Sequence, residues 1–328
     1  MARRTALPAA ALAGALLVPL ALGGCGLTSG SPMVDDVGPG SIGRGRPLKG
    51  ADLTVTSKNF SENIILGQIM GLAFRAAGAT VLDRTNIQGS FGAREAVKSG
   101  GADAMYEYTG TAWITYLGHD KPIPDPAAQW RAVAEADARN GITWLPPAAL
   151  NNTYALALSR AKERKYRTKT LSDVARLSKR DPSAVTLCVE SEFAARNDGL
   201  PGMAKAYGMT IPAARIRKMD GGIVYTQVSG GGSCTFGEVF TTDGRIKAMN
   251  LAVMEDDKHF FPNYNAAPEI NSKAMKKYPA IKAVLDPITA KLTDDVAREL
   301  NARVDVEGRD PHVVAKEWLV DEGFITEG

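Results

Sequence analysis

Short strand-like segments alternate with amphipathic helical segments along most of the chain. Residues 53–57 alternate apolar and polar side chains as a half-buried strand does. Ser61 then stands where a helix cap is expected, and the apolar side of the helix that follows carries Ile65, Ile69, Leu72 and Ala76. The chain therefore begins its ordered part as a strand followed by a helix.

The same alternation recurs further along. We expect strands at 80–85, 102–110, 142–145, 153–159, 184–190 and 233–240, and helices at 93–98, 127–140, 171–177 and from about Ser191. From about Ser272 the chain is chiefly helical, with a last helix after Pro311. Strands and helices that alternate at these lengths predict an α/β fold with mostly parallel sheets.

The length of 328 residues is enough for two lobes, each with its own core. We expect the first lobe to combine 51–150 with 254–328, and the second to be 151–253. Two crossings near Asn151 and Met254 then form the hinge. Ligands of open α/β sheets collect at the carboxyl ends of strands, so the strand-to-loop junctions are the places to look for a site.

The N-terminus has the pattern of an export signal. Arg3 and Arg4 precede an apolar stretch that is too short to span a bilayer, so residues 1–24 are predicted to be a signal peptide. The motif Leu-Gly-Gly-Cys at 22–25 resembles a bacterial lipobox, which makes Cys25 a candidate lipid anchor; the alternative is a plain signal peptide that happens to end near a cysteine. Residues 25–50, rich in Gly and Pro, are predicted to be a flexible, lipidated tether.

Composition and charge exclude several classes of function. A formal charge of +3 is small for a nucleic-acid binder, so no nucleic-acid partner is expected. The three histidines and three cysteines show no metal-ligand spacing, and we expect neither a metal nor a cofactor. The sequence also lacks GxSxG and HExxH, so we expect a protein that is not an enzyme.

Two cysteines lie in strand-like segments of the exported part. Cys188 and Cys234 are able to form one disulfide in an oxidising compartment. Two buried free thiols are the alternative, because the sequence does not give the Cα separation that a disulfide requires.

Aromatic residues and cations gather at the predicted strand-to-loop junctions. These junctions are SKNF at 57–60, YTGT at 108–111, NNTY at 151–154, VFTTDG at 239–244 and FPNYN at 261–265. A quaternary ammonium group donates no hydrogen bond, so a site that selects it uses the negative faces of several aromatic rings. Packing in the core is the plainer explanation for any one ring, but the set together suggests an aromatic pocket.

The junctions also carry a family resemblance. SKNFSENIILGQIM, MYEYTGTAW, NNTYALAL, EFAARNDGL, TTDGRI and DDKHFFPNYNAAP resemble, in order over about 51–325, the substrate-binding proteins of glycine betaine/choline-type ABC importers. The resemblance implies a two-lobed periplasmic-binding-protein fold, type II-like, that holds a compatible solute in the cleft between its lobes and delivers it to a membrane permease.

The resemblance assigns residues to two parts of a binding site. Tyr108, Tyr154, Tyr264 and Phe240 would form an aromatic cage around the trimethylammonium group, with Phe240 at a position where the family usually has Tyr. Lys58, Thr111 and Arg196 would form a clamp for a carboxylate. The plainer roles for these three are a solvated lysine, a turn-capping threonine and a salt bridge between the lobes.

The leading interpretation is therefore an extracytoplasmic, lipid-anchored solute receptor, expected to be a monomer, that binds glycine betaine, choline or a related quaternary amine. A receptor of the same fold for a polyamine or a basic amino acid is the first alternative, although its cleft should be acidic. An enzyme that uses the same cleft is the second.

Overall fold

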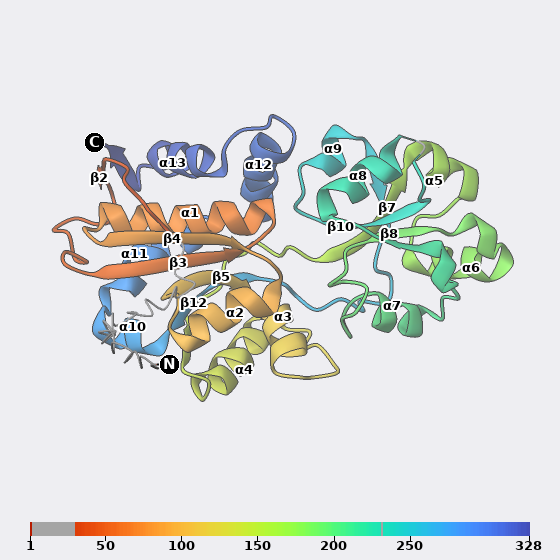
Figure 1. The fold of residues 1–328 in the computed structure, drawn as a ribbon. Helices are drawn as coiled ribbons and strands as arrows, with labels where there is room; N and C mark the ends of the chain where they lie inside the picture. The colour runs from red at the N-terminus through yellow and green to blue at the C-terminus, as the bar shows by residue number, and fades with distance from the viewer. Residues whose placement is uncertain (2–29, 231) are drawn as a thin grey trace.

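The computed structural model describes Met1, residues 30–230 and residues 232–328. Within this part of the chain two α/β lobes lie side by side (Figure 1), so the predicted fold class is confirmed. Cys25 and the predicted signal peptide from residue 2 onward lie outside the described residues.

The first lobe is built on a six-stranded sheet. Its strand order is β1 (Ser31–Pro32), β4 (Thr80–Ile87), β3 (Asp52–Lys58), β5 (Ala104–Tyr108), β12 (Ala266–Asn271) and β6 (Ile142–Trp144). Its helices are α1 (Ser61–Ala76), α2 (Ser90–Ser99), α3 (Thr109–Thr111), α4 (Pro126–Ala138), α10 (Ser272–Lys277), α11 (Ala280–Thr289), α12 (Asp294–Asp305) and α13 (Pro311–Asp321), with a π-helix at Ala112–Tyr116.

The second lobe is built on a five-stranded sheet. Its strand order is β11 (Leu251–Val253), β7 (Tyr154–Ser159), β10 (Phe236–Phe240), β8 (Leu187–Val189) and β9 (Ile216–Lys218). Its helices are α5 (Arg160–Tyr166), α6 (Leu171–Arg180), α7 (Leu200–Tyr207), α8 (Gly221–Ser229) and α9 (Arg245–Ala248), with short 3₁₀ helices at Pro182–Ala184 and Ala213–Arg215. The chain crosses from the first sheet to the second between β6 and β7, and returns between β11 and β12.

Most strands of each sheet run in one direction, as predicted, but both sheets also contain antiparallel strands. In the first sheet β3 pairs in parallel with β4 and β5, but β12 is antiparallel to both β5 and β6. In the second sheet β7 is antiparallel to β10 and β11. Besides the two-residue strand β1, the reversed strands are β7 and β12, which enter their sheets directly after a crossing between the lobes.

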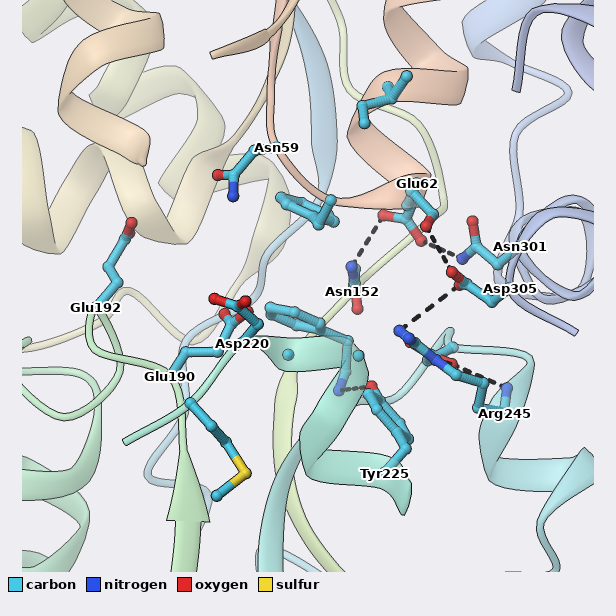
Figure 2. A pocket seen from close by; sticks show the side chains of 18 of the residues that line it. Asn59, Glu62, Asn152, Glu190, Glu192, Asp220, Tyr225, Arg245, Asn301 and Asp305 are labelled. Carbon is cyan, nitrogen blue, oxygen red and sulfur yellow. Dashed lines mark hydrogen bonds and ion pairs between the residues drawn. The ribbon is translucent and has the colours of Figure 1, made fainter. Parts of the chain in front are cut away.

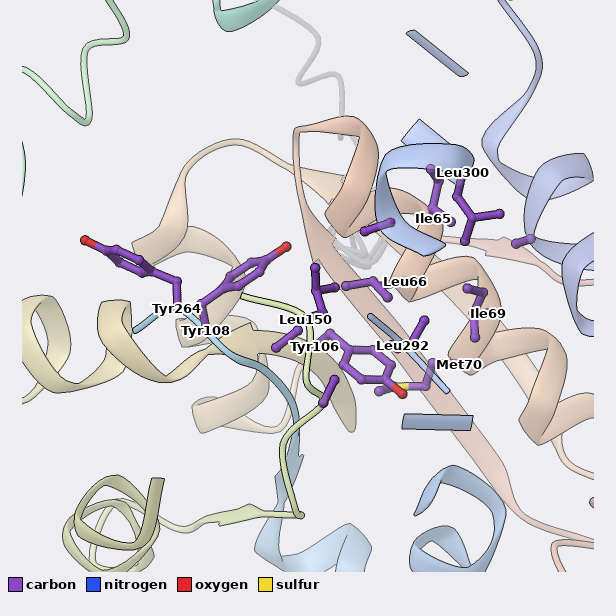
Figure 3. Close-up of a cluster of buried hydrophobic side chains, with 14 of the residues drawn as sticks. Ile65, Leu66, Ile69, Met70, Tyr106, Tyr108, Leu150, Tyr264, Leu292 and Leu300 are labelled. Carbon is purple, nitrogen blue, oxygen red and sulfur yellow. The ribbon is translucent and has the colours of Figure 1, made fainter. Parts of the chain in front are cut away.

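Helix α1 is the centre of the first lobe. Almost all of its residues are buried, because the helix packs on β3 and β4 with one side and on α11, α12 and α13 with the other. Figure 3 shows Ile65, Leu66, Ile69 and Met70 of this helix lying among Tyr106, Leu150, Leu292 and Leu300. Ser61 does not cap α1, contrary to prediction: the N-cap is Phe60, and the Ser61 hydroxyl donates instead to Asp305 Oδ1 at 2.5 Å.

The predicted tether is wrong for residues 30–50, which pack against the first lobe. β1 pairs with β4, and β2 (Val37–Pro39) pairs with β13 (Ile325–Glu327) near the C-terminus. Met33, Val37, Ile42 and Leu48 are all buried in the core. Met33 lies against Gly71 of α1, where a Cβ atom would stand 2.6 Å from the methionine methyl group. The Gly- and Pro-rich composition concealed these apolar residues, which are four to six positions apart.

One predicted helix is absent among the described residues. Residues 191–195 form a turn instead of the start of a helix, and the next helix, α7, begins at Leu200. This turn and the residue after it place the side chains of Glu192 and Arg196 in the cleft between the lobes.

Candidate functional site

The cleft between the lobes contains a small cavity at which the seven predicted binding residues meet. The cavity has a volume of about 60 Å³, and its lining includes Lys58, Tyr108, Thr111, Tyr154, Arg196, Phe240 and Tyr264. Lys58, Tyr108 and Phe240 are the last residues of β3, β5 and β10, and Tyr154 is the first residue of β7. The ends of strands from both sheets therefore supply the lining.

Tyr154 is the central ring of the aromatic group. Its centroid lies 5.2 Å from that of Phe240 and 5.3 Å from that of Tyr264, with the Tyr264 ring edge-on. Phe60 completes the group: it stacks on Phe240 at 5.3 Å and on Tyr108 at 6.0 Å. Sequence reasoning noted the SKNF junction but did not assign its phenylalanine to the cage.

A glycine in the YTGT turn makes room for one of these rings. A Cβ atom on Gly110 would lie 2.7 Å from Tyr264 Cδ1 and 2.8 Å from the carbonyl oxygen of Asn263. Any larger residue at this position would push the Tyr264 ring away, because real Cβ contacts are not that short. The YTGT and FPNYN segments are thus fitted to each other.

The tyrosine hydroxyls are held by buried carboxylates. Tyr108 donates to Glu62 Oε1 at 2.8 Å, and Tyr264 donates to Asp198 Oδ2 at 2.7 Å. Burial, reinforced by these negative neighbours, raises the pKa of both hydroxyls well above the usual value. Both tyrosines therefore stay neutral and keep fixed ring orientations.

Both cations of the predicted clamp already have carboxylate partners. Lys58 Nζ lies 2.6 Å from Glu107 Oε1, with both side chains buried, and 5.1 Å from the centre of the Tyr108 ring. Arg196 donates from Nε and Nη2 to the two oxygens of Asp198, at 2.7 and 2.5 Å, and from Nη1 to Glu192 at 2.9 Å. The positive charge at the cavity is therefore balanced from within the protein.

Arg196 also reaches the other lobe. Its Nη2 donates to Thr111 Oγ1 at 3.3 Å, and its guanidinium carbon lies 5.6 Å from the centre of the Tyr154 ring. Burial disfavours the charged guanidinium, but Tyr154 and the hydrogen-bonded Asp198 together outweigh it, so the pKa of Arg196 is raised well above the usual value. Arg196 remains a fixed cation at the cage.

Glu62 is a central residue that the sequence reasoning missed. This buried carboxylate on the first turn of α1 accepts hydrogen bonds from Tyr108, Asn152, Asn301 and Thr242. Burial raises its pKa in spite of these four donors. Figure 2 shows Glu62 between Asn152 and Asn301, at the meeting point of the two lobes.

Glu192 forms a second link between the lobes. It accepts from the backbone N–H of Ser90 at 3.1 Å and from the Ser90 hydroxyl at 2.5 Å. Burial alone would raise the pKa of this carboxyl. The positive charges of Lys58 and Arg196, together with the hydrogen bonds from Ser90, have a larger opposite effect, so the pKa is lowered overall. Glu192 is therefore ionised, and it joins the lobes beside the cage.

A larger pocket of about 580 Å³ adjoins the cage cavity, and Phe60, Asn152 and Phe240 line both. Many of its other lining residues are carboxylates (Figure 2). Among the described residues, no group of three or more His, Cys, Asp or Glu side chains is arranged to hold a metal ion.

Two further findings concern the rest of the chain. Cys188 and Cys234 form a disulfide, with their Cα atoms 5.7 Å apart. In the part of the chain that the structure describes, no helix is both long and apolar enough to cross a bilayer.

Residues 51–321 match the family model described as the substrate binding domain of ABC-type glycine betaine transport system. A glycine-betaine-binding protein of Pseudomonas aeruginosa is 37% identical over 84% of this chain and 89% of its own length. An ergothioneine transport permease/ergothioneine binding protein of Helicobacter pylori is 32% identical over 81% of this chain and 47% of its own length.

Among solved structures, a glycine betaine/carnitine/choline ABC transporter protein is similar with a TM-score of 0.68 and 28% identity. The match covers 83% of this chain and 99% of the other. A choline binding protein in complex with choline has the same fold, with a TM-score of 0.62 at 12% identity over 83% of this chain and 88% of the other.

Proposed function

Because the chain belongs to the family of substrate-binding domains of ABC-type glycine betaine transport systems, we propose that its cage holds the trimethylammonium group of a quaternary amine. The cage consists of Tyr108, Tyr154, Phe240 and Tyr264, with Phe60 as a fifth ring. A substrate-binding protein of this kind delivers its ligand to the importer without a chemical reaction.

The observation that carries the proposal is the grouping of five rings from both lobes around one cavity. Tyr154 lies within 5.3 Å of Phe240 and Tyr264, and Phe60 connects Phe240 to Tyr108. A desolvated cation gains up to about 2 kcal/mol from an aromatic face. Phe240 keeps such a face and lacks only the hydroxyl of a tyrosine.

We also propose that Thr111 and Arg196 receive the carboxylate of a short betaine, with Lys58 nearby. Thr111 lies on the first lobe and Arg196 on the second, so a ligand held by both stabilises the closed arrangement. Arg196 already binds Asp198 through Nε and Glu192 through Nη1. The carboxylate of the ligand must therefore share the guanidinium with both residues, or replace Glu192 at Nη1.

The location of the receptor follows from the same family. Substrate-binding proteins of importers act outside the cytoplasm, and we propose that lipid on Cys25 anchors this one to the membrane as a monomer beside its permease. Acyl labelling of the wild type and of Cys25→Ala tests the anchor; equal labelling of the two contradicts it.

Calorimetric titration of the full-length protein in a non-ionic detergent tests the cage. We expect glycine betaine and choline to bind, with carnitine titrated for comparison. Spermidine and arginine, which represent a receptor for other cations, should bind far more weakly. Tyr264→Ala should lose about 10- to 30-fold in affinity, whereas Tyr264→Phe, which keeps the ring and loses only the hydroxyl, should lose much less. Tyr166→Ala, at the end of α5 and outside both cavities, is the matched control. Unchanged binding in Tyr264→Ala contradicts the cage.

A further inference from the structure

The large pocket beside the cage is placed to receive the far end of an elongated ligand. It has a volume of about 580 Å³, and Phe60, Asn152 and Phe240 form part of both its wall and the wall of the cage. A ligand whose trimethylammonium group lies in the cage therefore extends into this pocket if it is longer than a compact betaine.

Carboxyl groups outnumber cations in the lining of the pocket. Two cations line it, Lys218 and Arg245, against six carboxylates, those of Glu62, Glu190, Glu192, Asp220, Asp243 and Asp305. Arg245 is committed to Asp243, with which it forms an ion pair and two further hydrogen bonds, and lies 3.7 Å from Asp305. On the side of the pocket near Glu190 and Asp220, carboxyl groups therefore outnumber the cations that remain available to pair with them.

Glu190 and Asp220 converge within this pocket, as Figure 2 shows. Glu190 follows β8 and lies against the backbone of Gly221 at the start of α8. Burial, together with the nearby Glu192 and Asp220, raises its pKa although the Gly221 hydrogen bond lowers it. Asp220 is the N-cap of α8 but makes no side-chain capping bond, and its side chain is exposed. Two carboxylates in this position favour a hydrogen-bond donor or a cation between them.

Asn152 supplies an independent indication at the junction of the cage and the pocket. Its amide nitrogen donates to Glu62 Oε1 at 2.9 Å, but its Oδ1 has no hydrogen-bond partner among the described residues, and the residue is only 6% exposed. Figure 2 shows this oxygen directed away from Glu62, and Asn152 lines both the cage cavity and the large pocket. A buried acceptor without a donor is costly, so the junction favours a ligand that donates a hydrogen bond there.

We propose that the pocket selects the far end of elongated quaternary amines, binding a hydrogen-bond-donating or cationic group and rejecting a carboxylate. This inference rests on the proposed function, since the trimethylammonium group must occupy the cage. Compact betaines keep their carboxylate close to Arg196 and Thr111, so we expect little discrimination against them, although Glu190 and Glu192 line the cage cavity as well as the pocket.

A pair of ligands with the same spacer tests the inference. (3-Aminopropyl)trimethylammonium and 4-(trimethylammonio)butyrate share the trimethylammonium group and a three-carbon spacer, and end in an ammonium and a carboxylate respectively. We expect the full-length wild-type protein to bind the first at least about tenfold more tightly by calorimetry, which corresponds to about 1.4 kcal/mol. Equal affinity, or tighter binding of the carboxylate, overturns the inference.

Two variants assign the preference to the pocket. Glu190→Gln and Asp220→Asn, which keep size and the ability to accept hydrogen bonds, should each reduce the preference for the ammonium-ended ligand severalfold. Glu135→Gln, an exposed carboxylate on α4 outside both cavities, is the matched control and should leave it unchanged. If the double variant Glu190→Gln/Asp220→Asn keeps the full preference for the ammonium-ended ligand, the assignment to these residues is overturned.

Tetramethylammonium, which has no far end, separates the two proposals. Binding of this ion to the wild type and to Asp220→Asn with similar affinity supports the cage and shows that this variant is folded. Because Glu190 also lines the cage cavity, Glu190→Gln is judged by the ratio of its affinities for the two elongated ligands. If tetramethylammonium and every other trimethylammonium ligand fail to bind, the proposed function is overturned and the inference falls with it. If it binds and the two elongated ligands do not differ, only the inference is overturned.

Discussion

The hydroxyl of Thr242, just after β10 in the second lobe, donates a 2.6 Å hydrogen bond to Glu62 Oε2 on the first turn of α1 in the first lobe. Both residues are buried, and Asn301 donates to the same oxygen at 3.0 Å. The side chain that fixes the Tyr108 hydroxyl is thus also a contact between the lobes. Closure of the lobes and orientation of a cage ring depend on the same carboxylate.

Thr242→Val should weaken ligand binding without removing the cage. The valine keeps the shape of threonine but takes one donor from a buried carboxylate, and hydrogen bonds to charged groups contribute about 1.5–3 kcal/mol. We expect about a 10- to 100-fold loss of affinity by calorimetry, with small-angle scattering showing a more open protein. Thr115→Val, at a buried hydroxyl without a partner among the described residues, is the control. Equal affinity of Thr242→Val and wild type would contradict the role of this contact.

Arg196→Gln should reduce affinity for glycine betaine more than affinity for choline. Both ligands lose the guanidinium near Tyr154, but only the betaine has a carboxylate that depends on it. We expect the difference between the two losses to be about tenfold by calorimetry. Because the variant also releases Asp198, the ratio of the two affinities is the readout. An equal loss for both ligands would mean that Arg196 supports the cage and does not bind the carboxylate.

Glu269 should make the protein less stable as the pH rises. Burial, with Glu107 and Asp137, outweighs the effect of Arg94 and raises the pKa of this β12 carboxyl from 4.5 to about 8. A group with a raised folded-state pKa contributes stability below the unfolded pKa and loses it as the pH passes from about 4.5 to about 8. Each pKa unit corresponds to about 1.4 kcal/mol, so the loss amounts to a few kcal/mol.

Glu269→Gln tests this dependence. We expect the variant to match the wild type near pH 4.5 and to exceed its free energy of unfolding near pH 8, measured by urea titration at several pH values. The amide oxygen can still accept the hydrogen bond that Arg94 Nη1 donates at 3.1 Å. Glu135→Gln, an exposed carboxylate, should follow the wild-type curve. A constant difference between Glu269→Gln and wild type across this range would refute the expected linkage.

Reduction of the Cys188–Cys234 disulfide should destabilise the second lobe. The bond closes a loop with a sequence separation of 46, for which the chain-entropy relation gives about 4 kcal/mol. We expect Cys188→Ala/Cys234→Ala to lose about 2–4 kcal/mol in denaturant unfolding. Dithiothreitol should destabilise the wild type by a similar amount and leave the double variant unaffected. A wild type insensitive to the reductant would show that the bond contributes nothing.

Removal of residues 30–50 should destabilise the first lobe. Met33, Val37, Ile42 and Leu48 are buried, and each such side chain contributes about 1.5–3 kcal/mol. A protein that begins at Ala51 should therefore unfold at a clearly lower temperature than one that begins at Gly30. Met33→Ala alone, in the longer protein, should account for part of the loss. Equal melting temperatures for the two lengths would show that the segment does not support the core.

The positions at which strands end could be predicted from the sequence. The partners of the side chains at those positions could not. Lys58 and Tyr108 could be placed at one cleft because the carboxyl ends of parallel strands meet at one edge of a sheet. Tyr154 begins β7 in the other sheet, and it was the family resemblance that placed it at the same cleft. Glu62 could not, because an acidic residue in the first turn of a helix is ordinarily a solvated partner of the helix dipole. Its four donors come from positions 46 to 239 residues away.

The charges of the cleft escaped prediction for the same reason. Asp198 precedes a glycine, a context typical of a turn residue, yet it binds both Arg196 and Tyr264. Lys58 was expected to face the ligand, yet its nearest partner is Glu107 of the adjacent strand. Spacing along the chain indicates which residue types are present at a junction. Which of them neutralise one another is decided by contacts between segments far apart in sequence.

The short N-terminal strand β1 has a consequence for assembly as well as for packing. Strand β4 would otherwise be the edge of the first sheet, with eight residues offering free backbone groups to another molecule. β1 covers it at two positions and places Pro32, which has no N–H to donate, opposite Leu82. A proline on the outermost strand gives an incoming chain no regular ladder to extend. The N-terminal segment thereby makes this part of the sheet edge unfavourable for pairing with another molecule.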